Sequence, residues 1–299
     1  MPQERVQYLP KKEILTFEEM ERIVRIVAAM GITKVRLTGG EPFVRNDLMK
    51  LIHSIVEIPG IKDLHLTTNG ILTAPHIPEL RRLGIASVNL SLDSLDKERF
   101  FQITRRDEFE STWRTFNLFL ENEIPLKINA VVMEGKNIED IIPMVELTRS
   151  LPVEIRFIEE MPFNGKGVTP TALTWTYKKI LQHIKTHFDS IEKLADDIHS
   201  TSYNYRVNGF KGTFGVIAAY SRTFCGTCNR IRITAQGTLK TCLYDGGVLD
   251  IKSLLRAGVS DEEVSEKLMV AFRHRAKDGF EAQTSKVTSA FESMSTIGG

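Results

Sequence analysis

All three cysteines of the chain lie in one short segment, and their spacing is typical of a metal site. The segment reads Phe224-Cys225-Gly-Thr-Cys228 and reaches Cys242 after thirteen further residues, a C-x2-C-x13-C pattern. A C-x2-C turn can bring two thiolates to one metal, and a third can arrive from the far strand of a hairpin. Three thiolates are one fewer than a closed zinc site or a usual iron–sulfur cluster has. The pattern predicts a three-thiolate cradle for an iron–sulfur cluster, with an open position where a substrate can bind.

Other interpretations of the same cysteines stay open at this point. A disulfide with one spare thiol is one, although disulfides are rare in cytoplasmic proteins. A zinc site completed by His199 or His274 is another. Cysteines that only pack in the core are less consistent with the C-x2-C spacing. Arg230 and Arg232 follow directly. We expect them to alternate on the adjoining strand and to face the same side, where they form either a solvated sheet face or a phosphate site beside the metal.

The composition excludes several classes of protein. The chain has 299 residues, 42% of them hydrophobic, and a formal net charge of +1. This charge balance gives no reason to expect a nucleic acid or an anionic membrane as a partner. No apolar run approaches the roughly 18 residues of a transmembrane helix, and the first residues lack the apolar core of a signal peptide. The expected location is the cytoplasm.

A regular alternation of strands and helices must position these residues. Thr16 and Glu19 form a predicted capping box for a helix that ends near Met30. A strand at 32–37, a tight loop at 38–42 and a helix after Asp47 follow. Further strands are expected at 63–66, 87–92, 127–132 and 154–158, and helices at 77–83, 111–121 and 138–149. Such repeated units predict a parallel α/β fold, closed or partly closed as a barrel.

The pattern changes near Pro162. Residues 163–170 are expected to form a loop, 175–188 a helix, 203–207 and 213–219 short antiparallel strands, and 261–274 a helix. The sequence therefore predicts a core at residues 1–164 and a C-terminal extension at residues 165–299 that carries the cysteine segment.

Several motifs, in order along nearly the whole chain, resemble the GTP 3′,8-cyclase family. This family comprises the radical S-adenosylmethionine enzymes that begin molybdenum cofactor biosynthesis. The motifs are Arg36-Leu-Thr-Gly-Gly-Glu-Pro, Thr67-Thr-Asn-Gly70, Asn89-Leu-Ser-Leu-Asp93, Arg156-Phe-Ile-Glu159, Phe224-Cys-Gly-Thr-Cys-Asn-Arg-Ile-Arg232 and Ile297-Gly298-Gly299. The resemblance implies conversion of GTP to 3′,8-cyclo-GTP, an incomplete TIM-type barrel, and a [4Fe-4S] cluster on Cys225, Cys228 and Cys242 whose open iron binds the guanine.

The resemblance also implies roles for other residues. The GTP contacts are Arg36, Thr67, Lys127, Arg156, Arg230 and Arg232. The S-adenosylmethionine contacts are Gly39, Gly40, Glu41, Ser91 and Met161, with Asn69 and Asp93 as weaker candidates. The terminal Gly298 and Gly299 would reach into the active site and support catalysis. A homodimer and a downstream cyclic pyranopterin monophosphate synthase are the expected partners.

Physical chemistry supports two of these assignments independently. A triphosphate needs several cations, and Arg36, Lys127 and Arg156 each lie on an expected strand. A single strand cation would more simply belong to a charge pair. The Gly39-Gly40-Glu41 loop follows a strand at its carboxyl end, where barrel active sites form, and glycines allow a ligand to approach the backbone closely. Its carbonyls and Glu41 can accept hydrogen bonds from an ammonium group.

The sequence departs from the family in one respect. The family holds a second [4Fe-4S] cluster on a C-x3-C-x2-C motif near the N-terminus, and no cysteine here precedes Cys225. We therefore expect an N-terminally truncated chain that lacks the first barrel strand and is inactive as given, with the second cluster present only in a full-length parent. The competing interpretations are another radical enzyme with an auxiliary cluster, and a non-catalytic zinc-binding or nucleotide-binding module.

Overall fold

The computed structural model describes residues 9–161, 173–221, 223 and 225–284. Eight of the described strands form one sheet. Their order across the sheet is β1 (Lys34–Leu37), β2 (Asp63–Thr68), β3 (Ser87–Ser91), β4 (Leu126–Val132), β5 (Glu154–Glu159), β8 (Thr213–Ile217), β7 (Ser202–Val207) and β6 (Ile191–Lys193). No pairing among the described strands joins β1 to β6, so the sheet is open. The chain divides into two compact units, which we call the sheet unit (described residues between 66 and 228) and the terminal unit (described residues 9–65 and 229–284).

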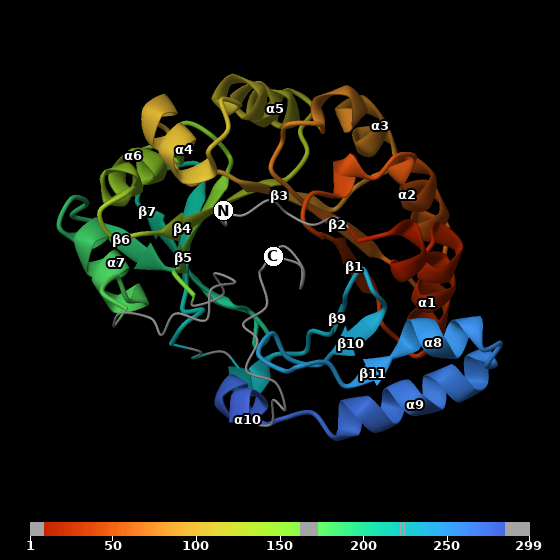
Figure 1. The fold of residues 1–299 in the computed structure, drawn as a ribbon. Coiled ribbons are helices and arrows are strands. Elements are labelled where there is room, and N and C mark those ends of the chain that lie inside the picture. Colours follow the sequence, from red (N-terminus) through yellow and green to blue (C-terminus); the bar gives the residue numbers. More distant parts are fainter. Residues whose placement is uncertain (1–8, 162–172, 222, 224, 285–299) are drawn as a thin grey trace. The chain divides into compact units, whose positions relative to one another are not determined.

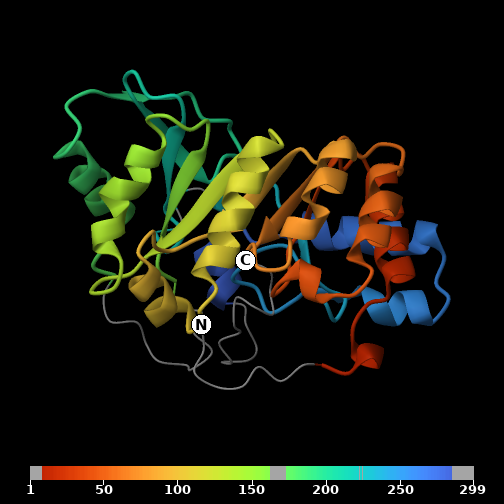
Figure 2. The same cartoon turned by 90° about the horizontal axis from the view of Figure 1, so that it is seen from above.

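The sheet unit is built on parallel strands. β3, β4, β5 and β8 pair in parallel, whereas β7 pairs antiparallel with β8, and β6 with β7 (Figure 1). Helices connect these strands: α3 (Ile77–Arg82), α4 (Lys97–Thr104), α5 (Phe109–Glu121), α6 (Ile141–Leu147) and α7 (Tyr177–Lys185). The turned view shows the helices of this unit, orange to green, alongside its strands (Figure 2).

Side chains on β4 and β5 alternate strictly between two faces. Leu126, Ile128, Ala130 and Val132 are buried on β4, as are Ile155 and Phe157 on β5. The residues between them, including Lys127 and Arg156, are only partly buried. Because side chains of a strand alternate across the sheet, the buried set forms an apolar face, and the other set, which also includes Val131 and Ile158, forms the face that we call polar. Lys127 and Arg156, two of the predicted GTP contacts, lie on this polar face.

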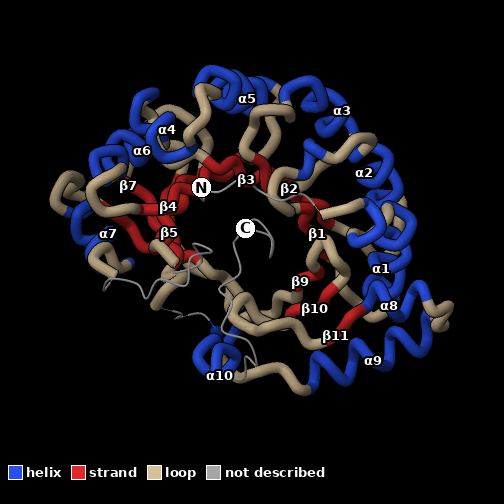
Figure 3. The backbone as a smooth tube through the Cα atoms, viewed as in Figure 1, coloured by secondary structure: helices blue, strands red, loops and turns tan. Residues whose placement is uncertain are grey.

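The terminal unit joins the beginning of the described chain to its end. Its first part holds α1 (Phe17–Ala29), β1 and α2 (Leu48–Val56). Its second part is a short antiparallel sheet of β9 (Arg232–Ile233), β10 (Thr238–Lys240) and β11 (Leu249–Asp250), followed by α8 (Ile251–Arg256), α9 (Asp261–Arg273) and α10 (Gly279–Thr284) (Figure 3).

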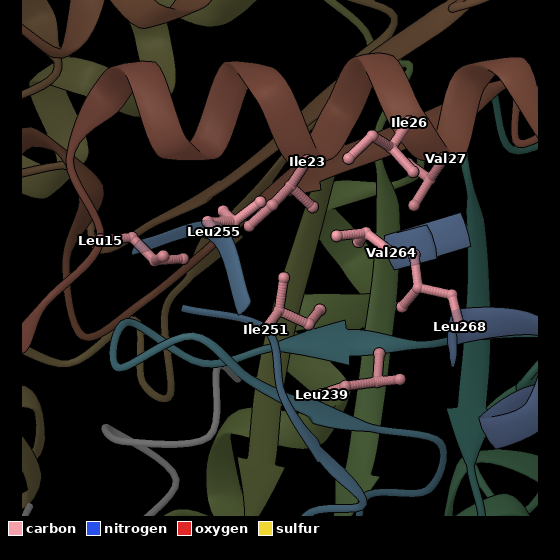
Figure 4. Packing of buried hydrophobic residues seen from close by; sticks show 9 residues of the cluster. All are labelled: Leu15, Ile23, Ile26, Val27, Leu239, Ile251, Leu255, Val264 and Leu268. Carbon is pink, nitrogen blue, oxygen red and sulfur yellow. The ribbon is translucent and has the colours of Figure 1, made fainter. Parts of the chain in front are cut away.

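An apolar cluster holds these two parts of the terminal unit together. It consists of nine buried side chains: Leu15, Ile23, Ile26, Val27, Leu239, Ile251, Leu255, Val264 and Leu268 (Figure 4). Three of them come from one face of α1 and pack against residues of β10, α8 and α9. Ion pairs reinforce the contact at its rim, where Arg22 binds Asp261 and Arg256 binds Glu19.

Most expected elements are present. The capping box is confirmed, because Thr16 accepts from the Glu19 N–H and Glu19 accepts from the Thr16 N–H. The expected antiparallel pairing near 203–219 is confirmed as β7 with β8, and the structure adds that β8 continues the parallel sheet next to β5. The sequence prediction missed α4, β6, β11, α8 and α10, none of which is longer than eight residues. The expected boundary after residue 164 stays a prediction. None of the described helices is long and apolar enough to cross a membrane.

Candidate functional site

Two of the predicted GTP contacts meet on the polar face of the sheet unit. Lys127 on β4 lies opposite Glu154 on β5 in the strand register, and its Nζ donates to Glu154 Oε2 at 2.6 Å. Arg156, two residues further along β5, donates from Nε to the other carboxylate oxygen, Oε1. Since residues i and i+2 of a strand point to the same face, one carboxylate binds both cations. We call Lys127, Glu154 and Arg156 the charged triad.

Burial shapes the electrostatics of the charged triad. The side chains are 28%, 18% and 18% exposed for Lys127, Glu154 and Arg156. Burial raises the pKa of Glu154, but the positive charges of Arg156 and Lys127 lower it by more, so the pKa lies below its ordinary value. The triad therefore carries one net positive charge at neutral pH. Cations arranged around an oxyanion in this way are suited to bind phosphate oxygens.

Amide side chains extend the polar face beside the triad. Asn89 on β3 is in register with Lys127, and Asn129 on β4 is in register with both Ser91 and Arg156. Within the described residues, the Oδ1 atoms of both asparagines are buried and have no hydrogen-bond partner. Buried amide oxygens are nearly always paired in folded proteins. Water or a ligand with hydrogen-bond donors would satisfy these two acceptors.

Three further predicted contacts belong to the sheet unit. Ser91 is the last residue of β3 and is exposed, and Thr67 on β2 is partly buried. Met161 lies two residues beyond the end of β5 and is partly buried. Ser91 and Met161 thus lie at the carboxyl ends of parallel strands, the edge at which α/β proteins form their ligand sites.

Asp93 and Asn137 fix the chain just after β3 and β4. Asp93 Oδ1 accepts from the Val131 N–H at 2.8 Å, and Asn137 Nδ2 donates to the carbonyls of Asp93 and Val131. Burial raises the pKa of Asp93 to about 6. Asp93, a weaker candidate for cofactor binding, thus has a structural contact within the sheet unit. Asn69, the other weaker candidate, accepts from the Ile71 N–H in a tight turn.

The glycine loop belongs to the terminal unit and follows β1, as expected. Arg36 lies on β1, and the loop begins after Leu37. Gly39 has a φ of +109°, a conformation that disfavours a side chain. A Cβ at Gly39 would meet nothing within 4 Å, so the space beside this backbone is open to a ligand. The Glu41 carboxylate accepts from the Phe43 N–H at 3.3 Å, which caps the short helix that follows.

Cys225 and Cys228 occupy one tight turn in the sheet unit. Residues Cys225–Thr227 form a 3-10 turn, and the Cys228 N–H donates to the Cys225 carbonyl at 3.3 Å. None of the three cysteines, all of which the structure describes, forms a disulfide. The disulfide interpretation is therefore wrong for this structure. His199, one proposed zinc ligand, donates from Nδ1 to the Thr227 carbonyl at 2.7 Å.

Cys242 belongs to the terminal unit, two residues after β10. Its N–H donates to Asp245 Oδ2 at 2.8 Å, and its Sγ accepts from the Tyr244 N–H at 3.5 Å. Asp245 also accepts from the Thr241 N–H and hydroxyl, so one carboxylate organises the turn. Backbone N–H groups directed at sulfur stabilise a thiolate and are typical of iron–sulfur ligands. The three thiols are the type of donor that iron–sulfur clusters bind.

The arginines after Cys228 differ from expectation in one detail. Arg232 begins β9 and pairs with Lys240 on β10, but Arg230 precedes the strand. The expectation that both alternate on one strand is therefore wrong, because β9 has only two residues. Among the described residues, no three histidine, cysteine or acidic side chains are grouped as a metal would require. Cys225 and Cys228 are brought together, while Cys242 lies in the other unit. Gly298 and Gly299 lie outside the described residues.

Sequence reasoning missed the carboxylates that organise the site. Glu154 was not singled out, although its place two residues before Arg156 on a strand puts both on one face. Its link to Lys127 spans 27 residues and depends on strand register. Asn129 and Glu159 were also not assigned a role. Glu159 is fully buried, and the sequence alone gives no sign that a strand-end glutamate is buried.

Comparisons with known proteins give consistent findings. Residues 3–148 match the radical SAM superfamily model, and residues 153–280 match the model called Molybdenum Cofactor Synthesis C.

A GTP 3′,8-cyclase of Syntrophomonas wolfei is 40% identical over 292 residues, which covers 94% of this chain and 88% of that protein. Molybdenum cofactor biosynthesis protein moc-5 of Caenorhabditis elegans is 38% identical, over 92% of this chain and 46% of that protein. The human molybdenum cofactor biosynthesis protein 1 is 37% identical, over 88% and 42%. The chain spans less than half the length of these two animal relatives.

Solved structures agree in fold. A crystal structure of Streptococcus suis SuiB matches with a TM-score of 0.59 at 15% identity and covers 93% of this chain and 70% of that chain. SuiB bound to S-adenosylmethionine matches with a TM-score of 0.58 at 16% identity, over 83% and 59%. At such identities the likeness concerns the fold alone.

Proposed function

Because the chain belongs to the GTP 3′,8-cyclase family of radical S-adenosylmethionine enzymes in molybdenum cofactor biosynthesis, we propose that it binds GTP and carries the substrate-binding part of the cyclisation to 3′,8-cyclo-GTP. Radical SAM membership implies S-adenosylmethionine and an iron–sulfur cluster as cofactors. The further assignments below are proposals that build on this family membership.

The observation that carries the proposal is the charged triad. Lys127 and Arg156 come from neighbouring strands and share the Glu154 carboxylate, an oxyanion. A triphosphate offers more oxygens and more charge than one carboxylate, so it can bind both cations with charge-assisted hydrogen bonds. The orphaned amide oxygens of Asn89 and Asn129 on the same face would accept from hydroxyl or amino groups of a nucleotide.

The metal chemistry is assigned to the cysteine segment. We assign a [4Fe-4S] cluster to Cys225, Cys228 and Cys242, with the open iron for the guanine. When bound, S-adenosylmethionine and a reduced cluster on ligands other than these three cysteines would supply the radical that takes a hydrogen atom from the ribose C3′. The protein itself holds the sugar and the base so that C3′ and C8 can join, which is catalysis by positioning.

The remaining residues take the roles that the family suggests. Further GTP contacts are Arg36, Thr67, Arg230 and Arg232. S-adenosylmethionine contacts are Gly39, Gly40, Glu41, Ser91 and Met161, and Gly298 and Gly299 support catalysis. The proposed location is the cytoplasm, and the proposed partners are a second copy of the chain and the cyclic pyranopterin monophosphate synthase that follows the cyclisation in the pathway.

Initiating the radical requires cysteine ligands beyond the three assigned to the substrate cluster. The printed sequence has no cysteine other than Cys225, Cys228 and Cys242. We therefore propose that this 299-residue chain binds both GTP and one cluster but produces no 5′-deoxyadenosine. After anaerobic reconstitution, iron analysis should give about four irons per chain rather than about eight. Formation of 5′-deoxyadenosine by this chain alone would contradict the proposal.

Calorimetric titration with GTP under anaerobic conditions tests the substrate. Binding of GTP that weakens on replacement of Lys127 or Arg156 by glutamine, and that perturbs the spectrum of the cluster, supports the proposal. Zinc without acid-labile sulfide, or a cluster spectrum that GTP leaves unchanged, would favour a zinc-binding module or a different radical enzyme.

A further inference from the structure

A second carboxylate of the sheet unit is buried more deeply than Glu154 and has a different set of partners. Glu159 ends β5 and is 0% exposed. Its Oε1 accepts from the Tyr177 N–H at 2.7 Å and from the Ser221 hydroxyl at 2.8 Å, and its Oε2 accepts from the Ser221 N–H at 2.7 Å. Burying a carboxylate is unfavourable unless hydrogen bonds compensate it. These three bonds make Glu159 a fixed point that joins β5, the start of α7 and the chain after β8.

The chain after β8 leads directly into the cysteine turn. Side chains from elsewhere in the sheet unit anchor it at three positions. Glu159 holds Ser221, the Tyr203 hydroxyl donates to Thr223 Oγ1 at 2.9 Å, and His199 Nδ1 donates to the Thr227 carbonyl at 2.7 Å. Tyr203 also stacks on Tyr177 with ring centroids 5.5 Å apart. Two of the three anchors therefore connect to Glu159, either directly or through Tyr177.

We propose that Glu159 is a positioning residue for the metal site: its buried carboxylate fixes the start of the segment that carries Cys225 and Cys228. This inference rests on the proposed function, because it takes the two cysteines as cluster ligands. Glu159 does not touch the metal in this account. It acts through Ser221, four residues before the first ligand, and determines where the two-cysteine turn begins.

The geometry explains why a carboxylate is needed. Both oxygens of Glu159 face hydrogen-bond donors, since Oε1 accepts two hydrogens and Oε2 accepts one. A glutamine has one oxygen and one NH₂ group. In either orientation its NH₂ would face an N–H or hydroxyl donor, so at least one of the three bonds is lost. Glu159→Gln therefore removes an anchor while keeping the size of the side chain.

Asp140 provides a matched control in the same unit. It is also buried, at 2% exposure, and its carboxylate accepts from the Ser94 hydroxyl, the Leu95 N–H and Arg99 Nε, each at 2.8 Å. Asp140 thus joins the loop after β3 to the start of α6, and none of its partners lies in the cysteine segment. Asp140→Asn should destabilise the fold in a comparable way without changing the cysteine turn.

The experiment compares metal retention in the full chain. Wild type, Glu159→Gln and Asp140→Asn are reconstituted anaerobically. Visible absorbance and iron content then give the rate at which each protein loses its cluster to a chelator. The temperature is chosen so that circular dichroism shows all three proteins to be folded. We expect Glu159→Gln to lose its cluster about tenfold faster than wild type, as the loss of one hydrogen bond to a charged group predicts. Asp140→Asn should stay within about twofold of wild type.

Two outcomes would overturn the inference. One is a Glu159→Gln cluster as long-lived as that of wild type. The other is equal acceleration in both variants, which would show that general destabilisation is the cause. Should Glu159→Gln fail to fold, Ser221→Ala removes only the hydroxyl donor, and unchanged cluster loss in that variant would likewise contradict the inference. If wild type takes up zinc without sulfide, the proposed function fails, while the same comparison of zinc release still tests the positioning role.

Discussion

The charged triad of the sheet unit and the apolar cluster of the terminal unit are organised by opposite means. Lys127, Glu154 and Arg156 are partly exposed and interact through charge. The nine side chains of the apolar cluster are each 7% exposed or less and interact through packing alone. Partly exposed ion pairs add little to folding stability, whereas buried aliphatic side chains contribute several kcal/mol in total. The comparison separates residues that hold the fold from residues that are available to a ligand.

The largest effect is expected from the centre of the apolar cluster. Leu239 on β10 is fully buried, and Leu239→Ala removes three carbons and leaves a cavity. The free energy of unfolding should fall by about 2–5 kcal/mol. Thermal unfolding measures the change, with Leu72→Ala as control because Leu72 is 45% exposed. A loss of unfolding free energy below about 1 kcal/mol in Leu239→Ala, or an equal loss in Leu72→Ala, would show that the apolar cluster does not hold the fold.

A substitution in the charged triad should change GTP affinity strongly and the free energy of unfolding only slightly. Arg156→Ala removes a cation from the proposed triphosphate site and should weaken GTP binding about 10- to 100-fold, the effect of losing a hydrogen bond to a charged group. Glu154 keeps Lys127 as a partner, so the unfolding free energy should change by less than about 1 kcal/mol. Arg149, which pairs with Glu146 on the same unit, supplies the control, since Arg149→Ala should leave GTP affinity unchanged. An equal loss of GTP affinity in Arg156→Ala and Arg149→Ala would show that the charged triad is not part of the GTP site.

Asp93 sharpens the comparison within the sheet unit, because its pKa shifts in the opposite direction from that of Glu154. Burial raises the pKa of Asp93 from 3.8 to about 6. Between these values the unfolded chain loses the proton first, so the free energy of unfolding falls as the pH rises from about 4 to about 6. Two pKa units correspond to about 3 kcal/mol, which is the upper bound of the expected fall.

Denaturant titrations of wild type and Asp93→Asn across this pH range isolate that contribution. The stability of wild type minus that of the variant should decrease between about pH 4 and pH 6 and stay constant above. A difference that rises with pH would mean that Asp93 is stabilised as a carboxylate in the fold.

The smallest effect is expected at the edge of the terminal unit. Thr16→Ala removes the side-chain cap of α1 and should lower the free energy of unfolding by about 1 kcal/mol. Thr16→Ser keeps the hydroxyl and serves as control. Chemical denaturation resolves the difference, and an alanine variant as stable as the serine variant would show that the apolar cluster alone determines the position of α1.

Much of the fold could be predicted from local sequence signals. The capping box of α1 involves residues three apart, and the apolar alternation of β4 appears within seven residues. Such patterns report local backbone structure. α4 was missed because Lys97–Thr104 has few apolar residues, and its start depends on the Asp96 side chain that accepts from the Arg99 N–H.

The site was predictable in its residue types but not in its connections. Lys127 and Arg156 were identified as cations on strands, and the glycine loop was placed correctly after β1. Their common partner Glu154 depends on the register between two strands, which no local pattern reveals. The role of Glu159 likewise arises from Ser221, 62 residues away. Contacts of this kind follow from the tertiary fold, and only the structure identifies them.

The apolar cluster of the terminal unit also has a consequence for synthesis on the ribosome. Helix α1 emerges well before its packing partners in β10, α8 and α9, since Arg22 and Val259 are 237 positions apart. At about 5–20 residues per second, that interval is roughly 12–50 s. During translation the apolar stripe of α1 is therefore exposed while the strands between residues 66 and 228 can already pair. During that interval the nascent chain offers a chaperone a defined apolar binding site.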